Sequence, residues 1–242
     1  MFRRILITAL LAGFLGGLGI SVVHQFTTVP IILHAEAFES EGAPDGHKHG
    51  VLKKVPNSLL HLVQAKESPS TENHVWAPAG RLERTLYSTL ANILTGIGFA
   101  LILVACIALS GRHVDGRTGV LWGIAGFAVI NLAPALGLPP EVPGSMAAEL
   151  GARQGWWMLC VAATAVGLWM LIFRHGAFWV VGGIIIMALP HLMGAPQPAR
   201  IGGPVPPELA GHFVAASLVT AAVFWCALGW LSGTFWQRLG AK

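Results

Sequence analysis

The chain has 242 residues, of which 54% are hydrophobic and only 11% are charged. Soluble domains average about 25% charged residues, so this composition excludes an ordinary water-soluble domain. The formal net charge is +4, and the charged residues are absent from several long stretches. This distribution indicates an integral membrane protein.

Six stretches are apolar enough to cross a hydrocarbon core, which requires about 20 residues of helix. None of them contains Asp, Glu, Lys or Arg. In chain order they cover residues 5–23, 86–109, 118–138, 155–173, 177–193 and 209–232. We therefore predict an all-α integral membrane protein with about six transmembrane helices, which form a single membrane domain over residues 1–242.

The first stretch follows Arg3 and Arg4, as a secretory signal would. A signal peptidase site should come directly after the apolar region. The nearest A-x-A pattern, at 35–37, lies well past that region and beyond Pro30. We therefore expect an uncleaved membrane anchor.

Lys and Arg in the short loops predict the orientation, because they favour the cytoplasmic side. With both termini inside, the two short outer loops contain only Arg153 and Arg200. The inner segments then contain Arg3, Arg4, Arg112, Arg117, Arg174, Arg238 and Lys242. This arrangement leaves one long outer loop, residues 24–85, between the first and second helices.

The same orientation places most acidic residues and histidines outside. Only Asp115 among the acids, and His113 and His175 among the histidines, fall on the inner side. The outer histidines are His24, His34, His47, His49, His61, His74, His191 and His212. Carboxylates and imidazoles together suit divalent cations such as cobalt, nickel and zinc, so the outer side has a composition that favours metal capture.

A short motif in the long loop, DGHKHG at 45–50, combines three such groups. His47 and His49 point to the same side of an extended chain, since they are two residues apart, and Asp45 precedes them. A mobile Gly- and Pro-rich loop of this kind would bind a divalent metal weakly. We predict an accessory capture site, although H-x-H pairs also arise by chance in loops.

The fifth stretch ends in LPHLMGAPQP (189–198), where Pro190 interrupts the helix next to His191 and Met193. Ionisable side chains at membrane depth are candidates for function. Glu208 and His212 are four residues apart and share a helix face. We predict that His191, Met193, Glu208 and His212 form a metal entry site. The alternative, that each histidine is an interfacial polar residue, remains open.

Polar residues deeper in the stretches offer a path across the membrane. Asn131 lies close to Pro134, and a helix broken by proline exposes carbonyls that can coordinate a cation. Asn92 is a further candidate. Hydrogen bonding between helices is the competing explanation for each of them.

Other chemistry is not indicated. Cys106, Cys160 and Cys226 lie singly in different apolar stretches, so we expect small core side chains without a disulfide or zinc site. No G-x-x-x-x-G-K-[ST] phosphate loop occurs, so the chain does not hydrolyse ATP in the P-loop manner. We expect no enzyme activity, no nucleic-acid partner and a lipid bilayer as the surrounding medium.

The sequence resembles the CbtA family of predicted cobalt transporter subunits. The matching segments run in order along nearly the whole chain: the FRRIL start, WAPAGRLERTLYSTLANILTGIGFAL (76–101), NLAPALGLPPEVPG (131–144), LGARQGWW (150–157), LPHLMGAPQP and FVAASLVT (213–220). The resemblance implies cobalt uptake across the bacterial inner membrane, feeding cobalamin biosynthesis. It also implies Co²⁺ as the transported ion, no permanent cofactor, and a small His-bearing membrane partner of the CbtB type.

Two alternatives to a metal importer remain. The chain is either a non-conducting accessory subunit of a metal transporter or a membrane haem or redox protein. The haem alternative requires His191 and His212 as axial ligands, facing each other across the helices.

Overall fold

The structure is a computed structural model that describes residues 1–42, 80–199 and 202–240. Every regular element among these residues is helical, which confirms the predicted all-α class. The elements are α1 (Phe2–Phe26), α2 (Thr28–Gly42), α3 (Arg81–Ser110), α4 (Gly116–Phe127), the π-helical turn η1 (Ala128–Leu132), α5 (Ala133–Ala135), α6 (Leu150–Phe173), α7 (Ala177–Met193) and α8 (Pro207–Gly240).

Five helical stretches in the described part of the chain are long and apolar enough to span a membrane. They are α1, α3, the continuous stretch Gly116–Ala135, α6 and α8. The remaining predicted span forms α7, with 17 residues. At 1.5 Å per residue it is about 26 Å long, slightly less than a typical hydrocarbon core of about 30 Å.

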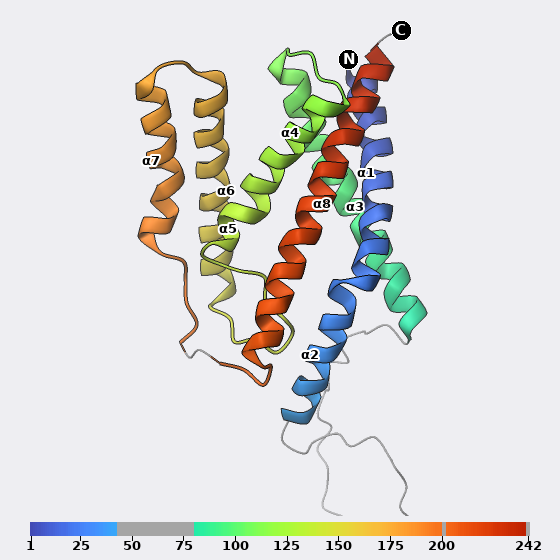
Figure 1. The fold of residues 1–242 in the computed structure, drawn as a ribbon, viewed down its shortest axis with the longest axis vertical. Coiled ribbons are helices and arrows are strands. Elements are labelled where there is room, and N and C mark those ends of the chain that lie inside the picture. The colour runs from blue at the N-terminus through green and yellow to red at the C-terminus, as the bar shows by residue number, and fades with distance from the viewer. Residues whose placement is uncertain (43–79, 200–201, 241–242) are drawn as a thin grey trace, which may run out of the picture.

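The chain runs back and forth between two ends of the molecule (Figure 1). Both termini lie at the upper end, as do the α3–α4 and α6–α7 connections. The last turn of α2, the start of α3 and the α5–α6 connection lie at the lower end, as do the end of α7 and the start of α8. This alternation is the one that six helices with both termini on one side require. The charge rule predicts that the upper end is cytoplasmic.

The bounds predicted for the long loop, residues 24–85, are wrong at both ends, because helices extend into it from either side. Helix α1 continues to Phe26, its backbone breaks at Thr27 (φ −117°, ψ −80°), and α2 follows to Gly42. Pro30 is tolerated because it occupies the first turn of α2, where an amide N–H has no helical partner. Helix α3 begins at Arg81 rather than residue 86. The DGHKHG motif, with Asp45, His47 and His49, lies outside the described residues.

The third predicted span, 118–138, ends as an irregular helix. Helix α4 passes into the π turn η1, where the amide of Ala133 bonds to the carbonyl of Ala128, and α5 ends at Ala135. Pro134 explains the irregularity, because it cannot donate a backbone hydrogen bond to the preceding turn. Bulges of this kind are frequent at functional sites.

Glycines hold the helices in close pairs, as small residues do in membrane proteins. A Cβ on Gly17 would lie 2.5 Å from the Cα of Ile93 in α3, and one on Gly123 would lie 2.1 Å from the carbonyl oxygen of Trp225 in α8. In the α6–α7 pair, a Cβ on Gly167 would lie 2.7 Å from the carbonyl oxygen of Gly183. By contrast, a Cβ on Gly98 would meet open space.

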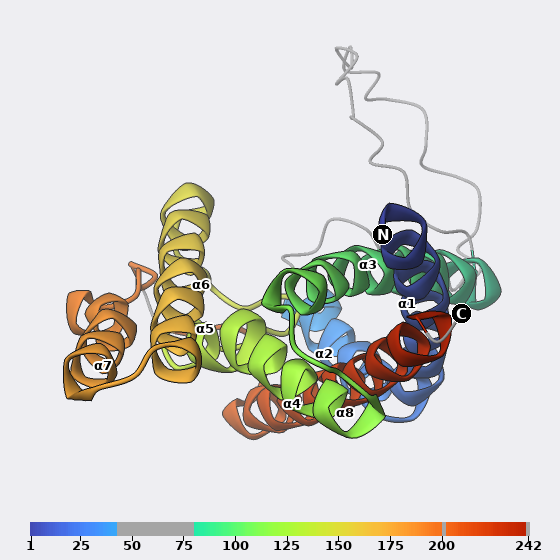
Figure 2. The ribbon, with the colours of Figure 1, turned by 90° about the horizontal axis from the view of Figure 1, so that it is seen from above.

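The helices form two groups. Helices α1, α3, α4 and α8 pack into a bundle, whereas α6 and α7 form a hairpin that stands to one side (Figure 2). The hairpin reaches the bundle through η1 and α5, which both contact α6. Among the described residues, α7 packs extensively only against α6. We call these groups the bundle and the hairpin.

A polar cavity in the bundle as candidate functional site

An open cavity of about 540 Å³ lies on the side of the bundle where α2 and η1 join it. Side chains from α1, α2, α3, η1 and α8 line it. Eleven of the twenty lining residues are polar: Ser21, His24, Gln25, Thr28, Ser88, Thr89, Asn92, Thr95, Asn131, Ser217 and Thr220. No carboxylate belongs to the described lining, so the cavity offers neutral oxygens and one imidazole.

His24 belongs to a hydrogen-bonded group on the α1–α3 wall. The amide nitrogen of Asn92 donates to Ser21 Oγ (3.1 Å) and lies 3.4 Å from His24 Nδ1. Ser21 Oγ donates in turn to the carbonyl of Gly17 (2.8 Å). An amide nitrogen only donates, so Nδ1 of His24 accepts in this contact and Nε2 carries the ring proton. Binding a cation at Nε2 therefore requires the other tautomer, in which the contact with Asn92 is lost.

The α8 wall contributes Ser217 and Thr220. Thr220 Oγ1 donates its proton toward the carbonyls of Ala216 (2.8 Å) and Ser217 (3.0 Å). Its oxygen lone pairs therefore stay available as acceptors. Such a hydroxyl can ligate a hard or borderline cation without carrying a charge.

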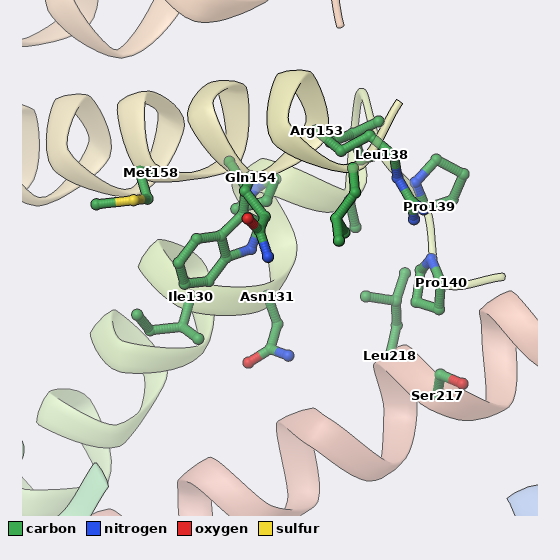
Figure 3. Close-up of a pocket in the computed structure, with 14 residues that line it drawn as sticks. Ile130, Asn131, Leu138, Pro139, Pro140, Arg153, Gln154, Met158, Ser217 and Leu218 are labelled. Carbon is green, nitrogen blue, oxygen red and sulfur yellow. The ribbon is translucent and has the colours of Figure 1, made fainter. Parts of the chain in front are cut away.

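Asn131 links this cavity to a second one. Its Oδ1 accepts a hydrogen bond from Trp225 Nε1 (2.7 Å), which fixes the amide at the surface of the π turn. Both Asn131 and Ser217 also line the second cavity, of about 760 Å³, between η1, α5, the loop after α5, α6 and α8. Figure 3 shows the Asn131 side chain pointing toward α8, where Ser217 lies. The two cavities thus share a wall made of these two residues.

Charged groups occur at the edge of the second cavity. Arg153, which lines it, donates to Glu141 Oε2 at 2.7 Å. Glu149 caps α6 by accepting from the amides of Gly151 (2.8 Å) and Ala152 (2.7 Å). These backbone hydrogen bonds lower the pKa of Glu149 below its ordinary value.

The predicted entry residues do not meet. His191 lies at the end of α7, where its Nε2 is 3.8 Å from Cys160 Sγ of α6. Met193 is 71% exposed. Glu208 and His212 are exposed in the first turns of α8, a helix that packs in the bundle. Within the described ranges, no three His, Cys, Asp or Glu side chains are close enough to hold one metal ion.

The haem alternative requires His191 and His212 to face each other. Since α7 packs on α6 and α8 packs in the bundle, the described residues bring no such pair together. Of the predicted path residues, Asn92 and Asn131 line the polar cavity, while Asn131 and Pro134 line the second one.

Sequence reasoning missed His24, which it assigned to the outer loop. The signal was present: Ser21 and His24 are three residues apart and share a face if the first helix continues past residue 23. Only the extension of that helix to Phe26 brings this face opposite Asn92.

Comparison with known proteins identifies the family. The family model described as "Probable cobalt transporter subunit (CbtA)" matches residues 2–237, nearly the whole chain. No curated protein and no solved structure matches the chain. The match includes every helix that lines the two cavities, and the chain belongs to the CbtA family of probable cobalt transporter subunits.

Proposed function

We propose that this chain conducts Co²⁺ into the bacterial cell through the polar cavity of the bundle, and that this uptake feeds cobalamin biosynthesis. The observation that carries the proposal is the gathering of an imidazole, three amides and seven hydroxyls between apolar spanning helices. Polar groups are costly at membrane depth unless they have partners or serve a permeating species. Membership of a cobalt transporter family supports Co²⁺ as that species.

The donor set suits transient rather than permanent binding. Imidazole is a good ligand for cobalt, whereas neutral hydroxyl and amide oxygens replace only part of its hydration. With no carboxylate in the described lining, a bound ion keeps its double positive charge and leaves easily. The membrane potential would favour entry by about 4.6 kcal/mol for two charges crossing 100 mV.

Entry would begin at the outer end of α8. Glu208 and His212 share an exposed face there, and Phe213, the next residue, already lines the cavity. The DGHKHG motif of the long loop would act as an accessory collector. A small His-bearing partner of the CbtB type would complete the outer mouth.

A non-conducting accessory role is the second candidate, because the described lining of the polar cavity holds no acidic residue. In that case the partner would provide the carboxylates. The two roles differ in whether the bundle of this chain limits the rate of uptake.

Uptake of radiolabelled Co²⁺ into cells that express the chain with its small partner tests the proposal. We expect His24→Ala to lose most of the uptake at equal membrane abundance. His34→Ala is the matched control, because His34 is exposed on α2 and stacks on Phe38 outside the cavity. Uptake by His24→Ala at the level of His34→Ala would exclude the cavity as the path and favour the accessory role.

A further inference from the structure

A second set of metal-binding atoms lies in the seam between α6 and α7, away from the bundle. Cys160 is fully buried on α6. Its Sγ lies 3.8 Å from Nε2 of His191, which is provided by the last turn of α7. The pair joins a thiol and an imidazole from two helices. It is independent of the cavity proposed for Co²⁺.

The imidazole is held in position by its neighbours. Trp156 Nε1 donates to the carbonyl of Pro190 at 3.0 Å, which ties the end of α7 to α6. The Trp156 ring also meets the His191 ring edge-on, with centroids 5.7 Å apart. Because Pro190 is fully buried, the backbone that carries His191 has little freedom to move. The nitrogen therefore faces the sulfur without rearrangement.

A buried hydroxyl lies in the same seam. Thr164 follows Cys160 by one helical turn on α6 and so lies on the same face. It is 2% exposed, and its hydroxyl interacts with the Cys160 thiol but meets no other partner within the part of the chain that the structure describes. Because a thiol is a weak hydrogen-bonding group, this buried hydroxyl is only weakly satisfied, and a ligand in the seam would give it a stronger partner. Met187, one turn before His191, adds a thioether that packs against Gly167.

We propose that Cys160 and His191 bind a soft monovalent cation, Cu(I), in the α6–α7 seam. Thiolate and thioether donors select such ions. Typical metal–thiolate and metal–imidazole bonds of about 2.3 and 2.0 Å across the 3.8 Å separation leave an S–metal–N angle of about 120°. That geometry has room for a third donor, and Thr164 or Met187 is available on the same faces.

Charge favours a monovalent ion over a divalent one. Binding replaces the thiol proton, so that Cys–SH and Cu⁺ give Cys–S–Cu and one H⁺, which leaves to solvent without any change of oxidation state. The buried product is neutral. With Co²⁺ it would keep a net positive charge, which is costly to bury among apolar helices.

The test uses the purified full-length chain in detergent without oxygen. Cu(I) is titrated in competition with a chromogenic Cu(I) chelator. We expect one tightly held equivalent in the parent chain, lost in Cys160→Ser and in His191→Ala. Cys106→Ser and Cys226→Ser are matched controls, because each removes another free cysteine, and both should keep the equivalent.

Gel filtration and circular dichroism establish that each variant is folded, and Cu(I) protection of Cys160 from alkylation in the parent chain gives a second readout. The proposal is overturned if the parent chain retains no Cu(I), if folded Cys160→Ser retains it, or if a control variant loses it. It is also overturned if Co²⁺ produces a Cys160-dependent thiolate charge-transfer band at lower concentrations than Cu(I) requires for binding. Co²⁺ uptake should be unchanged in Cys160→Ser. A failure of the Cu(I) proposal can therefore be distinguished from a failure of the proposed Co²⁺ path.

Discussion

The bundle and the hairpin use the same packing device but enclose different chemistry. Glycines bring α4 against α8 in the bundle and α6 against α7 in the hairpin. The bundle then borders an open cavity lined by hydroxyls, amides and the imidazole of His24, whereas the hairpin seam brings Cys160 to His191. Under the two proposals, donor softness, more than the number of ligands, separates the metals that the two regions suit.

Close glycine contacts should have the largest effect. Gly123→Ala would place a methyl group 2.1 Å from the backbone oxygen of Trp225, which has no side-chain freedom to yield. We expect such overpacking to lower the free energy of unfolding by about 1–3 kcal/mol or more. The loss would be seen as a lower melting temperature in detergent. Gly98→Ala, which meets open space, should melt like the parent chain. Equal melting of both variants would contradict the packing described for α4 and α8.

Substituting His24 in the bundle and His191 in the hairpin should affect different activities, Co²⁺ uptake and Cu(I) binding respectively. We expect His24→Ala to reduce Co²⁺ uptake about tenfold or more, equivalent to about 1.4 kcal/mol or more. His191→Ala should keep most of the uptake but lose Cu(I) binding. The measurements are initial uptake rates and the Cu(I) titration on the same variants. A large uptake defect in His191→Ala would indicate that His191 belongs to the conducting path, and that the bundle and the hairpin share one function.

Substitutions of Asn131 test whether its hydrogen bond supports the wall that the two cavities share. Asn131→Leu removes the acceptor of Trp225 Nε1, and an unsatisfied buried donor costs about 1–3 kcal/mol. We expect reduced thermal stability and slower Co²⁺ uptake. Asn131→Asp keeps an acceptor oxygen but adds a charge at membrane depth, so it should recover only part of the stability, and its charge should hold Co²⁺ longer. If Asn131→Leu is as stable as the parent chain, the hydrogen bond does not support the wall.

The ion pair at the edge of the second cavity should contribute little. Arg153 and Glu141 are each about one-third exposed (29% and 30%), and exposed pairs contribute about 0.2–1 kcal/mol. A double-mutant cycle with Arg153→Gln and Glu141→Gln should return a coupling in that range. A much larger coupling would indicate that this loop is locked to α6.

The smallest expected effect is a pH dependence at the start of the hairpin. Backbone amides of Gly151 and Ala152 lower the pKa of Glu149. A carboxyl whose pKa is lower in the folded state stabilises the fold above its unfolded pKa, and this contribution is lost as pH falls through the folded pKa. Glu149→Gln should therefore melt slightly below the parent chain at pH 7. The two should converge in acid, and an equal difference at all pH values would point to a cause other than ionisation.

Much of the fold was predictable because lipid imposes a simple rule. Charge-free stretches must be helical in the membrane, since every backbone polar group has to be satisfied within the helix. That rule located the cores of α1, α3, α4, α6, α7 and α8. Their ends were harder, because α2 and the start of α3 carry charged residues. Glu36 and Arg84, which bond to each other across these helices, show how such charges are accommodated outside the apolar stretches.

The candidate site was less predictable. Asn92 and Asn131 were expected to line a path, and both line the polar cavity, although their role in conduction remains a proposal. His24 and Cys160 were not expected, because each depends on a partner from a distant helix. Local spacing carries no information about which face of α3 meets α1, or which turn of α6 meets the end of α7.

By itself, the sequence determined the membrane class, the helical stretches, the irregularity at Pro134 and the resemblance to the CbtA family. These properties depend on composition, on local backbone chemistry and on motifs that lie within single segments. Tertiary structure alone decided that His191 pairs with Cys160 rather than with Glu208 and His212, and that His24 lines a cavity. The physical reason is that helix packing through glycine surfaces sets which faces meet, and only facing side chains can share an ion.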